Sequence, residues 1–238
     1  MGDDPVREMI ERELVIERDG WARERVDRVT ARLQRDVPEA ARLETLVVWS
    51  SRYAAFTGPG RTIYVSRRLL ERMPDDEAAA MVVAHELSHH RLGHVPMPSR
   101  LWRFVPLASA LRALTRWIAG PDNERDADLL AIELCMDAGY DVERCVVAFA
   151  LLEQVVLDYG DVDTVLGPES PHWWDRPSHE HLRARVAAVR AHADAVRRGE
   201  RLPLDVSRER ARRRYRRMLA IAGGAAATVA LLVLRRRL

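Results

Sequence analysis

Residues 75–93 read DDEAAAMVVAHELSHHRLG and predict one helix that carries an H-E-x-x-H motif. Asp75 is a suitable N-cap, and the acidic residues after it suit the positive end of a helix. Gly93 is a natural stop, so the helix should run from about Asp76 to Leu92. Its first half consists of small and apolar residues, and we therefore expect the helix to be buried.

The motif places His85 and His89 one turn apart on one face of this helix, where both imidazoles can reach the same metal ion. Catalytic zinc has three protein ligands and one open position, and it lowers the pKa of a coordinated water toward about 7. Glu86 neighbours the same face and can take the proton of that water. Two histidines and a glutamate on a buried helix need partners, which favours a metal site over surface histidines.

The third ligand decides the class of metal site. A metzincin needs glycine at position 92 and histidine at position 95, where this chain has Leu92 and Val95. A gluzincin needs a glutamate on a later helix, and Glu124 provides one within the acidic segment 123–128. Taken alone, that segment also fits the solvated start of a helix. Asp128 follows one turn later, as an acceptor behind the ligands or a tie between helices. The predicted ligands for one Zn²⁺ per chain are His85, His89 and Glu124.

Hydrophobic periodicity predicts an α+β domain that is mainly α, with a small β-sheet. Two β-rich runs, residues 46–49 and 62–65, look like strands of that sheet. Further helices are expected over about residues 6–36, 123–138, 141–159 and 178–198. The predicted organisation is a zinc domain over residues 1–198, a basic linker over 199–217 and a single hydrophobic helix over 218–234.

Composition limits the classes of function. The apolar fraction of 47% is enough for a core, and the net charge of +2 excludes a polycation of the kind that binds nucleic acid. Every basic residue is arginine, so arginine-rich surfaces carry little information about partners. Cys135 and Cys145 cannot make a disulfide framework, which fits a reduced, cytosolic-facing domain. The charged residues 1–13 contain no apolar run, and we expect no secretory signal peptide.

Residues 218–234 form an uncharged run of 17 residues between two groups of arginines. As a helix this run would span roughly 25 Å, slightly less than a bilayer core, and the flanking arginines can reach the headgroups. We expect a single-pass C-terminal membrane anchor, with an amphipathic or core helix as the alternative. More arginines precede the run than follow it, which predicts a cytoplasmic catalytic domain. Leu101–Ala119 fits either the bilayer surface or, slightly better, an inner wall of the domain.

Several segments resemble the gluzincin endopeptidases that include the HtpX-like heat-shock proteases and the CAAX prenyl proteases, family forty-eight of the metallopeptidases. The resemblance covers about residues 21–189. It rests on AFTGPG at 55–60 with IYV at 63–65, DEA at 76–78, VVAHELSH at 82–89, ERDAD at 124–128, AGYD at 138–141, and Ser178-His179 followed by Arg185-Val186.

This resemblance implies a zincin-like domain that cleaves protein or peptide substrates with Glu86 as the general base. It implies that His179 stabilises the oxyanion or sits on the zinc as a resting-state plug, and that Arg185 braces the acidic residues of the site. Two other hypotheses remain open from the sequence. One is a non-catalytic, membrane-tethered adaptor that binds zinc in the same cleft, and the other is a helical membrane adaptor without metal.

Overall fold

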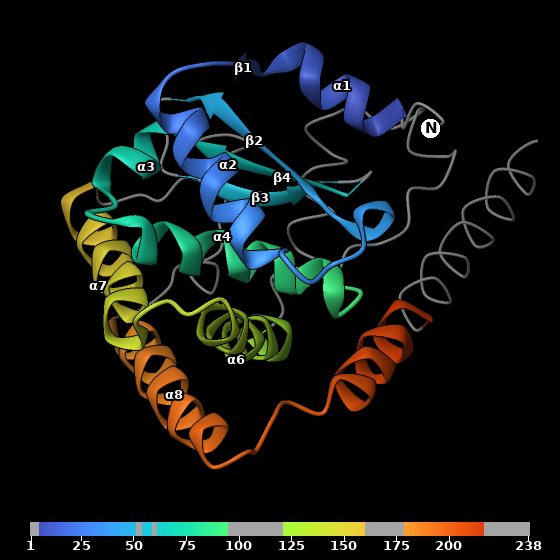
Figure 1. Cartoon of the computed structure of the whole chain (residues 1–238), viewed down its shortest axis with the longest axis vertical. Coiled ribbons are helices and arrows are strands. Elements are labelled where there is room, and N and C mark those ends of the chain that lie inside the picture. The colour runs from blue at the N-terminus through green and yellow to red at the C-terminus, as the bar shows by residue number, and fades with distance from the viewer. Residues whose placement is uncertain (1–4, 51–53, 59–60, 95–120, 160–178, 217–238) are drawn as a thin grey trace, which may run out of the picture.

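The computed structural model describes residues 5–50, 54–58, 61–94, 121–159 and 179–216 (Figure 1). The fold is mixed and mainly helical, with one four-stranded sheet, which confirms the predicted class. The strands are β1 Val15–Glu17, β2 Glu44–Trp49, β3 Ala55–Gly58 and β4 Thr62–Ser66. The α-helices with defined bounds are α1 Pro5–Glu13, α2 Trp21–Leu33, α3 Arg67–Arg72, α4 Asp76–Arg91, α6 Pro121–Asp137, α7 Val142–Tyr159 and α8 His179–Arg197, and a short 3₁₀ helix covers Glu39–Ala41.

The sheet has the strand order β1-β2-β4-β3. Strands β2 and β4 are parallel, while β1 pairs antiparallel with β2 and β3 pairs antiparallel with β4. In the last pair Thr57 lies opposite Ile63. Because β3 comes last in the strand order, it is an edge strand, and it packs against α4.

The prediction of one helix over residues 6–36 was wrong, because a strand interrupts it. Residues 15–17 pair with β2, with Val15 opposite Trp49 and Glu17 opposite Val47. Gly20 then has φ 92, a conformation that favours glycine and that ends any continuous helix at this point. Backbone pairing with the sheet outweighs the helical periodicity of this segment.

The main core lies between the sheet and the layer formed by α2 and α4, and it extends to α6, α7 and α8. In Figure 1, α2 and α4 lie over one face of the sheet, with α6, α7 and α8 on the far side of α4. A smaller cluster on the other face joins Ile10 of α1 to Leu46, Val48 and Tyr64. Helix α4 is thus central, and its alanines let neighbouring elements approach closely.

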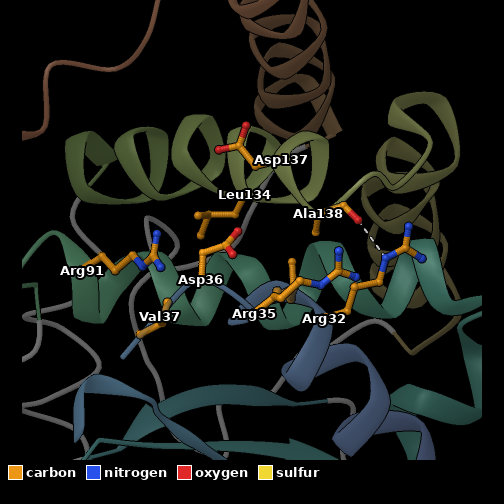
Figure 2. Close-up of a pocket in the computed structure, with 9 residues that line it drawn as sticks. Arg32, Arg35, Asp36, Val37, Arg91, Leu134, Asp137 and Ala138 are labelled. Carbon is orange, nitrogen blue, oxygen red and sulfur yellow. Dashed lines mark hydrogen bonds between the residues drawn. The ribbon is translucent and has the colours of Figure 1, made fainter. Parts of the chain in front are cut away.

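An arginine joins the first long helix to the end of α6. Arg32 donates from Nε to the carbonyl of Ala138 over 2.8 Å, the dashed line in Figure 2, and from Nη2 to that of Gly139 over 2.7 Å. Its guanidinium also lies 3.9 Å from the ring centre of Tyr140. These contacts satisfy carbonyls that the end of α6 leaves open. A polar cavity of about 270 Å³ lies here, with Arg91 and Asp137 in its lining.

Most of the segment expected as a basic linker is helical. Residues 204–216 form a helix, drawn in orange-red in Figure 1. Arg208 donates from Nε to the carbonyl of Arg91 at the end of α4 over 2.9 Å. Arg210 forms an ion pair of 3.2 Å with Asp126 of α6. This helix therefore touches both helices that carry the predicted metal ligands.

Two predictions fall on segments that lie outside the described residues. They are the wall or membrane-surface role of Leu101–Ala119 and the hydrophobic helix over 218–234. Within the ranges that the structure describes, no helix combines the length and the apolar character needed to cross a bilayer.

Candidate zinc site

The ends of α4 are fixed by signals that the sequence carries. Asp75 accepts a hydrogen bond from a backbone N–H of the first turn over 2.9 Å, as an N-cap does. At the other end Gly93 has φ 72, and its N–H donates to the carbonyl of His90 over 3.1 Å. The N–H of His94 donates to the carbonyl of His89 over 2.8 Å. This is the Schellman arrangement, and it turns the chain back toward the motif.

Three side-chain atoms converge where α4 and α6 face each other. The Nε2 atoms of His85 and His89 are 3.1 Å apart. Oε2 of Glu124 lies 3.3 Å from Nε2 of His85, and the other carboxylate oxygen, Oε1, lies 3.4 Å from Nε2 of His89. Among the described residues, these three form the one group of this kind whose ligand atoms could hold a metal ion.

The spacing of these atoms fits zinc. Ligands about 2.0–2.1 Å from a tetrahedral Zn²⁺ lie roughly 3.3 Å from one another. The two Nε2 atoms are 3.1 Å apart, and a Glu124 oxygen lies 3.3 Å from the first and the other oxygen 3.4 Å from the second, which is close to that spacing. Two imidazoles and one carboxylate are also a donor set that zinc binds in hydrolytic enzymes. The residues present therefore suit a mononuclear site with one position left for water or substrate.

Asp128 lies behind His85 on the same helix as Glu124. Its Oδ1 is 2.9 Å from Nδ1 of His85, so the carboxylate can accept the Nδ1 proton and leave Nε2 free for a metal. Arg185 of α8 donates to both carboxylate oxygens of Asp128 over 2.7 Å and lies 3.5 Å from Glu124. Helix α8 thus supplies the cation that lies between the buried carboxylate of Asp128 and the partly buried carboxylate of Glu124.

Residues 17–119 match the model of peptidase family M48. Over these residues, which are less than half of its length, the chain is similar to this family. The match includes all of α4 with His85 and His89, and it stops before Glu124, whose place in the site rests on the geometry above. Comparison with curated proteins gives no match.

Family M48 consists of zinc metallopeptidases, and the histidine and glutamate cluster of this chain agrees with that chemistry. The surroundings of the cluster favour a cation. Burial would lower the pKa of His85, but Asp128 and Glu124 raise it to about 10. Burial would raise the pKa of Glu124, but His85 keeps it well below its usual range. The same negative charge that holds a proton on His85 would stabilise Zn²⁺.

Glu86 is buried beside the ligands, and burial raises the pKa of its carboxyl group. Thr57 of β3 reaches it from the edge of the sheet, with Oγ1 2.5 Å from Oε2 of Glu86. His94 lies behind the second ligand, with its Nδ1 3.0 Å from Nδ1 of His89. Neither Thr57 nor His94 was predicted from the sequence to have a role in the site.

A local signal existed for only one of these two contacts. Gly93 directly before a histidine indicates that the chain folds back onto the last turn of the helix, which brings His94 to His89. Thr57 is 29 residues from Glu86 and meets it only because β3 packs along α4, so periodicity could not indicate the contact. His179 begins α8, and its side chain lies outside the part of the chain that the structure describes.

Proposed function

We propose that this protein is a zinc-dependent endopeptidase of the gluzincin type, with His85, His89 and Glu124 as the metal ligands. The convergence of the two Nε2 atoms and the Glu124 carboxylate, with nearest separations of 3.1–3.4 Å, carries the proposal. A bound zinc ion would act as a Lewis acid that polarises the scissile carbonyl and makes water a better nucleophile.

The protein supplies the proton transfers through Glu86. Its carboxylate takes a proton from the attacking water and later delivers it to the leaving amine nitrogen. The position of Glu86 supports this role, because it follows the proposed ligand His85 directly in α4 and its side chain is buried. Asp128 and Arg185 keep His85 in the orientation that points Nε2 at the metal position.

The test measures bound zinc and peptidase activity separately, on the full-length purified protein. Wild type should bind about one zinc per chain. His85→Ala and Glu124→Ala should lose most of it, while Glu133→Ala, which removes another buried carboxylate of α6, should keep it. Full zinc content in both ligand variants would show that the assigned ligand set is wrong.

Glu86→Gln should retain zinc and the fold while hydrolysis of an unfolded protein substrate falls by about 100- to 10,000-fold. Activity within a few-fold of wild type would show that Glu86 is not the base. An inactive wild-type protein with full zinc would instead favour the non-catalytic adaptor.

For His179 we propose that its imidazole stabilises the oxyanion during cleavage. The support is the resemblance of the Ser178-His179 and Arg185 spacing to the family, and the fact that α8 also brings Arg185 to the site. His179→Ala should lower kcat by roughly 100-fold with KM nearly unchanged. A rise in activity would identify His179 as a resting-state plug, and an unchanged rate would remove it from the site.

We also propose that residues 218–234 anchor the protein in a membrane and that the catalytic domain lies on the cytoplasmic side. The uncharged run of 17 residues and the arginines on both sides support the anchor. The heavier group of arginines precedes the run, which supports the orientation.

A further inference from the structure

Thr57 occupies the point where the edge of the sheet meets the metal-binding helix. Its side chain is buried, and its Oγ1 lies 2.5 Å from Oε2 of Glu86 and 3.1 Å from the backbone carbonyl of the same residue. Within the described residues, no hydrogen bond reaches the other carboxylate oxygen, Oε1. One hydroxyl therefore holds one of the two carboxylate oxygens of the proposed base.

The position of the hydroxyl is fixed by the residues on both sides of it. Phe56 stacks on Tyr64, with ring centres 4.9 Å apart. Gly58 lies so close to Tyr64 that an added Cβ would be 2.4 Å from its ring, so only glycine fits this register. Because neighbouring residues of a strand face opposite sides of the sheet, packing of Phe56 on one side directs Thr57 toward α4 on the other.

The two distances distinguish the partners of the hydroxyl. A threonine hydroxyl has one proton, and a separation of 2.5 Å is typical of a strong hydrogen bond to a carboxylate. The proton therefore points to Oε2 of Glu86. The carbonyl at 3.1 Å is a second acceptor, to which the hydroxyl can turn once the carboxyl group itself carries a proton and donates to Oγ1. Thr57 can thus remain a partner of Glu86 before and after it takes up a proton.

We propose that Thr57 is a positioning residue for the reaction, which rests on the proposed role of Glu86 as the base. It binds Oε2 and keeps the carboxylate in one rotamer, so that Oε1 exchanges protons with the attacking water and the leaving amine. Placement of a catalytic group within about 1 Å is worth up to about 100-fold in rate, which is the scale expected for this contact.

If Thr57 served only as a structural contact between β3 and α4, a different result would be expected. A hydroxyl that served only to join the two elements would need the backbone carbonyl alone, and its removal would lower stability without changing the activity of the folded, zinc-loaded protein. The discriminating quantity is therefore kcat per bound zinc, measured together with KM.

The experiment compares Thr57→Val, Thr57→Ala and Thr57→Ser with wild type on one peptide substrate. Valine keeps the shape and loses the hydroxyl, alanine also relieves any crowding, and serine restores the hydroxyl. We expect kcat per bound zinc to fall by about 10- to 100-fold in the first two, with KM nearly unchanged, and to stay within a few-fold of wild type in the third. Thr45→Val, a buried threonine of β2 whose hydroxyl contacts Thr30, should leave kcat unchanged.

The proposal would be overturned if Thr57→Val and Thr57→Ala both kept kcat per bound zinc within two-fold of wild type. The same holds if both variants fold poorly but the zinc-loaded fraction has normal activity. Failure of serine to restore the rate would overturn it as well. Glu86→Gln, assayed in parallel, separates the two ideas. An active Glu86→Gln would refute the proposed function, whereas an inactive one beside a fully active Thr57→Val would refute only the role of Thr57.

Discussion

His94 lies against His89, with 3.0 Å between the two Nδ1 atoms, because Gly93 turns the chain back at the end of α4. A hydrogen bond between two imidazole nitrogens needs one proton, and a proton on Nδ1 of His89 leaves its Nε2 free to bind metal. Histidine ligands usually have a partner of this kind on the nitrogen that faces away from the metal. Each histidine ligand of this site therefore has its own partner, Asp128 for His85 and His94 for His89.

Removal of His94 should weaken zinc binding without removing a ligand. Loss of such a partner typically costs about 10- to 100-fold in metal affinity, and we expect this range for His94→Ala in competition with a chelator. His90→Ala is the matched control, because His90 is next to His89 in the same helix but lies near the carbonyl of Thr62 instead. Wild-type zinc affinity in His94→Ala would show that the ring contact does not position His89.

Arg185 should matter more for stability than any exposed arginine of its helix. Arg185→Ala removes the guanidinium from Asp128, whose side chain is only 3% exposed, and leaves His85 as its partner. Removal of one partner from a buried ion pair costs about 3 kcal/mol. The free energy of unfolding from urea titration should fall by about that amount. Arg190→Ala removes an exposed ion pair with Glu143 of α7, and it should change the free energy of unfolding by less than about 1 kcal/mol. Equal effects of the two substitutions would contradict the assigned role of Arg185.

The sequence was sufficient wherever the signal is local. Asp75 and Gly93 predicted a helix over about residues 76–92, and α4 covers Asp76–Arg91. The one-turn spacing of His85 and His89 likewise predicted two nitrogens on one face, which lie 3.1 Å apart. Capping and helical periodicity act within a few residues, so one sequence contains them in full.

Features that depend on tertiary packing were harder to predict. The strand at residues 15–17 exists because β2 pairs with it, and three residues are too short a run to indicate a strand by themselves. The contact between Thr57 and Glu86 depends on how β3 lies along α4. Pairing partners across many residues are set by the whole core, and a single sequence without relatives does not identify them.

The helix over residues 204–216 should be needed for a stable zinc domain, although this segment was predicted as a linker. Ser207 and Ala211 are buried in it, and Arg208 satisfies a carbonyl at the end of α4. A chain that ends at Gly199 should melt several degrees below one that ends at Arg216, since each kcal/mol corresponds to about 2–4 °C in a domain of this size. Equal melting temperatures would show that the helix contributes nothing to the fold.

Arg210 provides a finer test of the same helix. Its ion pair with Asp126 of α6 is half-exposed on the arginine side, so Arg210→Ala should cost no more than about 1 kcal/mol. Arg208→Ala removes a single hydrogen bond and should cost a similar amount. If either substitution alone matched the effect of ending the chain at Gly199, the burial of Ser207 and Ala211 would not be the main contribution.

Attachment of the protein to membranes through residues 218–234 can be tested by fractionation. Full-length protein should sediment with the membrane fraction and resist extraction by high salt or carbonate, whereas a chain ending at Arg216 should stay in the supernatant and still cleave peptides. The comparison keeps the helix over residues 204–216 in both proteins, so a difference between them comes from the last 22 residues alone. Arginines that held the protein only by charge would release it in salt, because exposed charges are screened within about 8 Å at physiological ionic strength. A spanning helix would not be released, since its backbone hydrogen bonds are satisfied internally and its side chains prefer lipid.

Protease added outside intact cells should leave the catalytic domain uncut. Digestion from outside would reverse the proposed orientation, and extraction of the full-length protein by salt would refute the anchor.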